Sequence, residues 1–333
     1  MDYRRLAGTD LDVSVLCFGP MRSAARTPSA DDRSQAGERA LRTALDSGVN
    51  FVHSSYEYGV RWMMNGVLRD HPKRHDIHHV IKLPGPDWKD GNRFDAAKFR
   101  MRVEEALTDL AAERIAVLQW MWRTDPNDDD NRVKVLPMIV DDVTAAFETL
   151  RDEGKVGFLS TFPYTSAAAK AAIDTDAFSG LIGFYNPIEM EMQPLFAELA
   201  EKNMGFLCIR PLYQGILTDG RDSLDALPDG HHLKKPENAP EFAKRRAVVS
   251  AFAEEIGDST TRFALRFPLL SESVASVITG LNTEAQVRHA IDCLSGVTPR
   301  PDLTARALRL WQQDLVRLDG RMVCSPVAAG VAA

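Results

Sequence analysis

The stretch Asn50-Phe51-Val52-His53-Ser54-Ser55-Tyr56-Glu57-Tyr58-Gly59 holds a short apolar run followed at once by polar and aromatic residues. Such a run is typical of a buried parallel strand, and the residues after it are typical of a loop that carries function. The preceding segment, Gln35–Asp46, has Ala40, Leu41 and Ala44 at helical spacing. This part of the chain therefore predicts a helix, a buried strand and a site loop in succession.

The same alternation of buried strands and amphipathic helices extends over nearly the whole chain. The predicted strands are Val13–Cys17, Phe51–Ser54, His79–Leu83, Ile115–Met121, Phe158–Thr161, Leu181–Tyr185, Gly205–Arg210 and Ser276–Thr279. Besides the first helix, the predicted helices are Ala96–Leu110, Asp141–Asp152, Glu191–Lys202 and Thr283–Leu294. This alternation favours a closed (β/α)8 TIM barrel of the α/β class. A doubly wound open sheet is the alternative, but no Gly-x-Gly-x-x-Gly motif follows the first strand.

Composition narrows the class of protein. The chain has 333 residues, 44% of them hydrophobic and 26% charged, with a formal net charge of −7. Scattered Lys and Arg residues argue against a nucleic-acid partner, and no apolar stretch approaches the about 20 residues that a membrane span needs. The cysteines lie far apart, without metal-ligand spacing, so we expect free thiols, no metal site and a cytoplasmic protein. The oligomeric state is left open.

The predicted boundaries follow from composition. Residues 1–320 form a single barrel, with long loops at about 123–140 and 213–242, and residues 321–333 form a flexible tail. Both loops follow predicted strands, so we expect them over the carboxyl end of the barrel, where sites of this fold are built.

Several side chains that could carry chemistry fall at the carboxyl ends of the predicted strands. A Lys beside a Tyr is a recognisable acid–base device, because the ammonium stabilises the phenolate and lowers the pKa of the phenol. Tyr58 and Lys82 are the candidates, with His53 as a third catalytic residue. The candidate residues for binding a small-molecule substrate are Met121, Trp122, Arg123 and Trp88. Arg123 and Arg210 both end predicted strands, where they either hold a substrate carboxylate or phosphate or are charges on the rim of the pocket.

The chain resembles the aldo-keto reductase superfamily over most of its length. The opening stretch resembles the N-terminal hairpin of that family, and Phe18-Gly19-Pro20-Met21 resembles its first strand-end loop. Asn50–Gly59 is similar to its second strand and catalytic loop, and Pro211-Leu212-Tyr213-Gln214-Gly215-Ile216-Leu217-Thr218 to the segment after its seventh strand. The order and spacing of these stretches imply the barrel of the family.

The resemblance also implies roles for individual residues. Of the family's Asp, Tyr, Lys and His tetrad, the Tyr that donates a proton falls on Tyr58 and the Lys on Lys82. The Asp falls on His53 and the His on Met121. Half of the tetrad is therefore replaced.

The implied cofactor is NADP or NAD. The resemblance places it against Gly19, Arg210, Leu212, Gly280, Asn282 and Gln286. The polar residues that hold the nicotinamide in the family are replaced by Phe162-Pro163 and Ile182, and the stacking aromatic by Ile209. Asn282 stands where a Lys or Arg would meet a 2′-phosphate. These changes leave open whether a nicotinamide binds at all.

Two kinds of enzyme are compatible with these residues. One is a divergent aldo-keto reductase that interconverts a carbonyl and an alcohol with NAD(P)H, using Tyr58 as acid and Lys82 as its activator. The other is a redox-neutral acid–base enzyme, a lyase, isomerase or cyclase, whose substrate occupies a more apolar version of the nicotinamide site. A non-catalytic binding protein on the same barrel is a third alternative.

Overall fold

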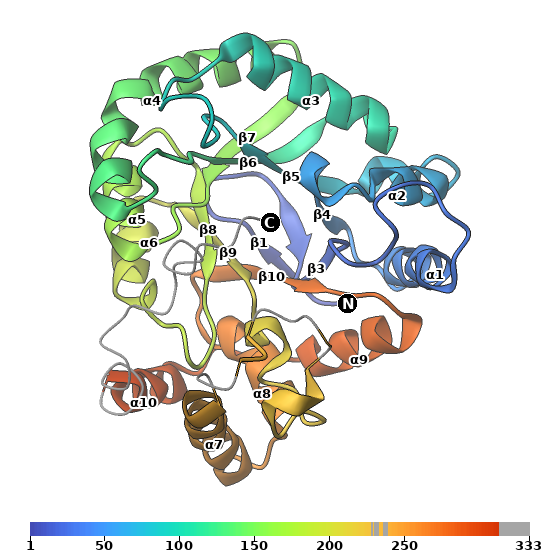
Figure 1. Cartoon of the computed structure of the whole chain (residues 1–333), viewed down its shortest axis with the longest axis vertical. Helices are drawn as coiled ribbons and strands as arrows, with labels where there is room; N and C mark the ends of the chain where they lie inside the picture. Colours follow the sequence, from blue (N-terminus) through green and yellow to red (C-terminus); the bar gives the residue numbers. More distant parts are fainter. Residues whose placement is uncertain (228, 230–232, 236–238, 313–333) are drawn as a thin grey trace.

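The computed structural model describes residues 1–227, 229, 233–235 and 239–312. Its centre is a closed barrel of parallel strands in the order β10-β3-β4-β5-β6-β7-β8-β9, ringed by helices (Figure 1). The predicted (β/α)8 barrel is confirmed. The barrel strands are β3 (Leu16–Gly19), β4 (Phe51–Ser55), β5 (His78–Pro84), β6 (Ile115–Met121), β7 (Val156–Thr161), β8 (Gly180–Phe184), β9 (Gly205–Ile209) and β10 (Val274–Gly280).

The helices ring the outside of the strands (Figure 1). They are α1 (Asp32–Asp46), α2 (Arg61–Leu68), α3 (Ala96–Leu110), α4 (Asp129–Asp152), α5 (Ser166–Asp174), α6 (Phe196–Glu201), α7 (Ala239–Glu255), α8 (Thr260–Arg266), α9 (Glu284–Leu294) and α10 (Pro301–Leu310). Helices such as α1, α3 and α9 are amphipathic. Several begin at a side-chain cap of the expected kind: Asp95, for example, accepts a hydrogen bond from the backbone N–H of Lys98.

The predicted first strand, Val13–Cys17, is wrong in its bounds, because only Leu16 and Cys17 of it lie in the first barrel strand. The structure divides it into β2 (Asp12–Ser14), which pairs antiparallel with β1 (Tyr3–Arg5), and the barrel strand β3. The chain bends at the break, where the hydroxyl of Ser14 donates to the carbonyl of Leu16 (2.7 Å). Such local side-chain bonds compete with strand pairing. The β1–β2 hairpin adds Leu6 and Val13 to the apolar interior of the barrel.

The predicted loop at 123–140 is also too long, because α4 begins at Asp129. Asp128 caps this helix by accepting from the backbone N–H of Asn131 (2.8 Å), and the acidic first turn suits the positive end of the helix dipole. Pro137 lies inside the helix without ending it. In its described part, the loop at 213–242 holds the 3-10 turns Tyr213–Gly215 and Leu224–Ala226, and it ends earlier than predicted because α7 begins at Ala239. Residues 321–333 lie outside the described part of the chain.

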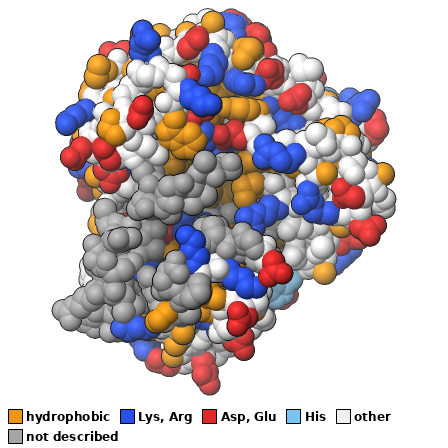
Figure 2. All heavy atoms as spheres, in the orientation of Figure 1, with side chains coloured by type: hydrophobic (Ala, Val, Ile, Leu, Met, Phe, Trp, Pro, Cys, Tyr) orange, Lys and Arg blue, Asp and Glu red, His pale blue; other side chains and the backbone are white. Residues whose placement is uncertain are grey.

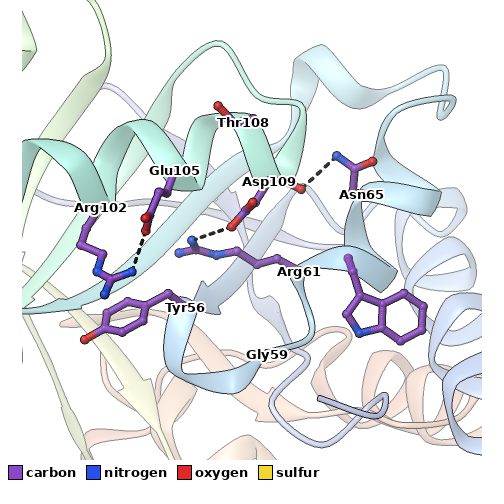
Figure 3. Close-up of a pocket in the computed structure, with 9 residues that line it drawn as sticks. Tyr56, Gly59, Arg61, Asn65, Arg102, Glu105, Thr108 and Asp109 are labelled. Carbon is purple, nitrogen blue, oxygen red and sulfur yellow. Dashed lines mark hydrogen bonds and ion pairs between the residues drawn. The ribbon is translucent and has the colours of Figure 1, made fainter. Parts of the chain in front are cut away.

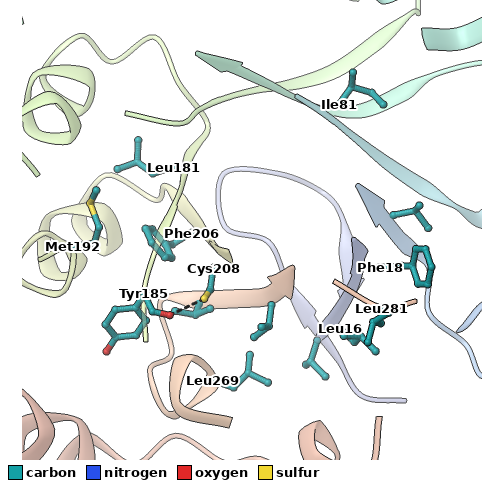
Figure 4. Close-up of a cluster of buried hydrophobic side chains, with 14 of the residues drawn as sticks. Leu16, Phe18, Ile81, Leu181, Tyr185, Met192, Phe206, Cys208, Leu269 and Leu281 are labelled. Atoms are coloured by element: carbon teal, nitrogen blue, oxygen red, sulfur yellow. Dashed lines mark hydrogen bonds between the residues drawn. The ribbon is translucent and has the colours of Figure 1, made fainter. Parts of the chain in front are cut away.

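The main apolar core lies between the strands and the surrounding helices. In the part drawn in Figure 4, Tyr185, Phe206 and Cys208 pack together at β8 and β9, and the thiol of Cys208 donates to the carbonyl of Tyr185 (2.9 Å). On the face shown in Figure 2, acidic and basic side chains are intermingled. Within the described residues, no helix has both the length and the apolar character needed to cross a membrane.

Candidate active site

The loop after β4 brings Tyr58 to the carboxyl end of the barrel. Ser55 caps a single 3-10 turn, Tyr56–Tyr58, by accepting from the backbone N–H of Glu57, and Gly59 ends the turn at a φ of 67°. A left-handed residue at this position favours glycine. The turn therefore fixes where the phenol of Tyr58 lies, directly beyond the end of its strand.

Lys82 lies on the neighbouring strand and reaches the same loop. It pairs in register with Ser55, and its ammonium lies over the ring of Tyr58, 5.4 Å from the centroid. Its Nζ contacts Oε2 of Glu57 at 2.7 Å. Burial lowers the pKa of Lys82, and the carboxylate of Glu57 opposes that shift.

The expectation that Lys82 lowers the pKa of Tyr58 is wrong for this arrangement. Burial, and next the charge of Glu57, raises the pKa of Tyr58 above its ordinary value. The physical reason is that the ammonium of Lys82 contacts a carboxylate and lies against the face of the phenol ring. Tyr58 is therefore a protonated phenol throughout the neutral range, which is the form that can donate a proton.

His53 is buried on β4, and its ring centroid lies 5.8 Å from that of Tyr58. Its Nε2 lies 2.7 Å from Oε1 of Gln119 on β6. With the carboxamide in this orientation, the imidazole donates from Nε2 and keeps Nδ1 as an acceptor. Burial lowers the pKa of His53 to about 4, so the ring is neutral at pH 7.

Glu57 is a charged residue of this site that no motif of the sequence singles out. Its carboxylate receives Arg123 on both oxygens, at 2.6 and 3.0 Å, in addition to Lys82. Arg123 also contacts Asp87 at 3.1 Å, and its guanidinium stacks over Trp88 at 4.3 Å. Burial alone would raise the pKa of Glu57, but its bonds to Arg123 and Lys82 outweigh burial and lower it. The carboxylate is ionised at neutral pH.

These contacts correct the proposed role of the two arginines. Arg123 is bound by Glu57 and Asp87, and Arg210 contacts Glu189 at 2.9 Å. Both guanidinium groups are thus paired with carboxylates of the chain. A substrate anion would have to displace those carboxylates, so the arginines do not form a ready-made anion clamp.

The structure separates the predicted substrate residues. Met121 points to the barrel end and packs with Phe162, Tyr164 and Phe184 in a small apolar cluster beside Ile209. Successive residues of a strand face opposite sides, so Trp122 points outward instead. It is fully buried, stacks on Trp120 at 5.1 Å, and donates to the carbonyl of Arg132. Trp122 is therefore a core residue.

The candidate cofactor residues fall into two groups. Gly19 and Gly280 lie side by side at the ends of β3 and β10. Close to them, the backbone N–H of Asn282 donates to Oε1 of Gln286 at 2.8 Å, where α9 begins. Arg210 and Leu212 belong to the segment after β9, the strand that pairs with β10 on its other side. Ile182, one of the apolar replacements, belongs to the deeper interior cluster.

A pocket of about 690 Å³ opens outside the barrel, between α2 and α3 (Figure 3). The residues that line it are Tyr56, Gly59, Arg61, Trp62, Asn65, Arg102, Glu105, Thr108 and Asp109. Its charges are paired: Arg102 contacts Glu105 within α3 at 2.7 Å, and Arg61 of α2 contacts Asp109 of α3 at 3.4 Å. The residues described as its lining do not include a predicted catalytic side chain, although Tyr56 and Gly59 flank Glu57 and Tyr58.

Comparison with known proteins gives the same assignment at the level of family and fold. The model of the Aldo/keto reductase family matches residues 15–301. An uncharacterized oxidoreductase, YqkF of Bacillus subtilis (strain 168), is 23% identical over 327 residues, covering 96% of this chain and 95% of its own. A probable voltage-gated potassium channel subunit beta of Arabidopsis thaliana is 23% identical over 330 residues, covering 90% and 94%.

Solved structures show the same fold. The holo form of aldo-keto reductase AKR11C1 from Bacillus halodurans superposes with a TM-score of 0.68 at 19% identity, covering 93% of this chain and 96% of its own. The glycerol dehydrogenase AKR11B4 from Gluconobacter oxydans gives a TM-score of 0.68 at 21% identity, covering 100% and 99%.

Proposed function

Since this chain belongs to the aldo/keto reductase family, which supports a general oxidoreductase function, we propose that it interconverts a carbonyl group and an alcohol at the carboxyl end of the barrel. The observation that carries this proposal is the position of Tyr58, on the capped turn after β4 and against Lys82. A phenol held at a strand end, beside a cation from the next strand, is placed to give a proton to a carbonyl oxygen.

Tyr58, Lys82 and His53 have different roles in this proposal. Tyr58 stays protonated at neutral pH, so in the reducing direction it donates its proton to the developing alkoxide oxygen. Lys82 provides positive charge near the phenolate that remains. His53 is neutral, is hydrogen-bonded to Gln119 and packs beside the ring of Tyr58, so it adds no charge to the site.

The residues present fit a nicotinamide cofactor in part. A Cβ built on Gly280 would meet nothing within 4 Å, so the chain at the end of β10 is open to close approach by a pyrophosphate, beside the N-terminus of α9. Gly19, Asn282 and Gln286 would contact the cofactor near its pyrophosphate. Arg210 and Leu212 would contact the part of the cofactor nearer the nicotinamide ring. When bound, the cofactor would supply the hydride that accompanies the proton from Tyr58. The apolar replacements at Phe162 and Ile182 give its carboxamide little to bind.

That apolar surface supports a second candidate function. Met121, Phe162, Tyr164 and Phe184 form a contiguous cluster at the ends of β6 to β8. If the substrate itself packs on this cluster, Tyr58 and His53 remain as an acid and a base for a redox-neutral reaction such as elimination or isomerisation. The two candidates differ in whether they need a nicotinamide.

Calorimetric titration with NADPH and NADH separates them. We expect saturable binding with little preference for NADPH, because Asn282 offers no positive charge to a 2′-phosphate. In the matched variant Asn282→Arg, a charge-assisted contact should strengthen NADPH binding by roughly tenfold and leave NADH binding unchanged. Absence of heat for both cofactors at millimolar concentration would remove the reductase and favour the redox-neutral enzyme.

A further inference from the structure

The charge that faces Lys82 comes from the loop after β4 instead of from a barrel strand. Lys82 is largely buried, with 18% of its side chain exposed, and a buried ammonium is stable only when it is paired. The strand position below Tyr58 holds His53, a neutral imidazole that is turned to Gln119. The carboxylate of Glu57, 2.7 Å from Nζ, fills that need.

Arg123 holds this carboxylate in one orientation. It binds both oxygens of Glu57 in a fork, which restricts rotation of the carboxylate plane. Arg123 is itself only 6% exposed and is fixed by Asp87, by the face of Trp88 and by the hydroxyl of Tyr164 at 3.4 Å. The result is a row of alternating charges, Lys82–Glu57–Arg123–Asp87, that reaches from β5 across the catalytic loop.

From this geometry we propose that Glu57 is the positioning residue of the site: it holds the Lys82 ammonium against the Tyr58 ring, and Arg123 orients it. Glu57 and Tyr58 are consecutive in one short turn, so the loop carries the proton donor and the anchor of its cation together. The proposal rests on the proposed function only for its catalytic consequence, since the contact itself is independent of any reaction.

The test measures the protonation of Lys82 directly. The wild-type protein and the variant Glu57→Gln are labelled with limiting acetic anhydride across a pH series, and the Lys82 peptide is quantified by mass spectrometry. Removing the carboxylate takes away the charge that favours the ammonium. We expect Lys82 to be labelled about tenfold faster near neutral pH, the effect of a fall of roughly one unit in its pKa.

Controls separate this effect from loosening of the fold. Glu105→Gln makes the same change on α3, in contact with Arg102, and should leave Lys82 labelling unchanged. Lys98 and Lys155, which pair with Asp90 and Glu104, serve as internal references in every sample. Glu57→Asp keeps the charge and should return Lys82 labelling most of the way to the wild-type rate.

An effect on charge also predicts different results for two neighbours. Arg123→Met keeps the carboxylate of Glu57 and removes a cation that disfavours the Lys82 ammonium, so Lys82 should be labelled much more slowly than in Glu57→Gln. The proposal would be overturned if Lys82, Lys98 and Lys155 were all labelled faster in both Glu57→Gln and Arg123→Met. It would also be overturned if the labelling of Lys82 in Glu57→Gln matched wild type.

Turnover gives the second readout. With a carbonyl substrate, Glu57→Gln should lower kcat by about tenfold or more with little change in KM, because it disturbs the group next to the donor and leaves the substrate contacts in place. If no carbonyl substrate turns over, the proposed function fails while the Lys82 labelling result still stands. If turnover is found and Glu57→Gln matches wild type in both readouts, only the role of Glu57 fails.

Discussion

Replacing Tyr58 with Phe is expected to lower turnover by about 10²–10⁴-fold, the usual contribution of a positioned general acid, while the barrel remains folded. The substitution removes the hydroxyl and keeps the ring, so the contacts of that ring with Lys82 and His53 are preserved. The loss should appear in kcat, because proton donation occurs in the transition state. Steady-state kinetics with a carbonyl substrate and saturating nicotinamide measure it.

Tyr56 supplies the matched control. It lies on the same turn, but its ring packs under Arg102, 4.0 Å from the guanidinium carbon, and lines the outer pocket. Tyr56→Phe deletes the same atom within the same loop and should leave turnover within about threefold of wild type, the scale of a surface substitution. Activity retained in Tyr58→Phe, or lost equally in Tyr56→Phe, would show that Tyr58 is not the proton donor.

The second large effect is a loss of stability in mild acid. Burial lowers the pKa of both His53 and His79 from 6.5 to about 4. Both rings are neutral above pH 6.5, folded or unfolded, so their contribution is constant there. As the pH falls from 6.5 toward 4, both imidazoles become protonated in the unfolded chain but stay neutral in the folded chain. Each histidine therefore lowers the free energy of unfolding by up to about 3 kcal/mol.

Urea unfolding at several pH values measures this loss. His79 is the informative position, because its Nδ1 has no hydrogen-bond partner among the described atoms. An apolar replacement therefore removes no hydrogen bond of that atom. His79→Leu should flatten the decline in stability between pH 6.5 and 4, whereas His75→Gln, at an exposed site, should not. Equal pH dependence in wild type and His79→Leu would mean that His79 is protonated in the folded protein.

Most of the fold could be predicted because the buried strands are short apolar runs in regular alternation with helices. Ile115–Met121 and Ala96–Leu110 coincide with β6 and α3. The errors lie where local polar contacts override the apolar pattern, as at Ser14, or where helix caps resemble loop residues, as at Asp128. Helix α5, which is short and rich in alanine, lies where no helix was predicted.

The sequence predicts which strand ends come together at the site, but not the contacts between their side chains. Tyr58, Lys82 and His53 lie together in the structure because the carboxyl ends of β4 and β5 are neighbours. The outward direction of Trp122 could have been predicted from strand alternation with Met121. The role of Glu57 could not, since its contact with Lys82 depends on the conformation of a single 3-10 turn. Likewise, the sequence does not show that Arg123 is already occupied by carboxylates.

The most direct test of the account is whether this chain transfers hydride to a carbonyl carbon. The protein is incubated with NADH or NADPH carrying deuterium on the transferred position, and with a panel of aldehydes and ketones, and the products are examined by mass spectrometry. We expect an alcohol with one deuterium on carbon, formed by wild type and Tyr56→Phe and nearly absent with Tyr58→Phe. A cofactor that binds but never delivers deuterium, or products that form without it, would contradict the assignment of this site to carbonyl reduction.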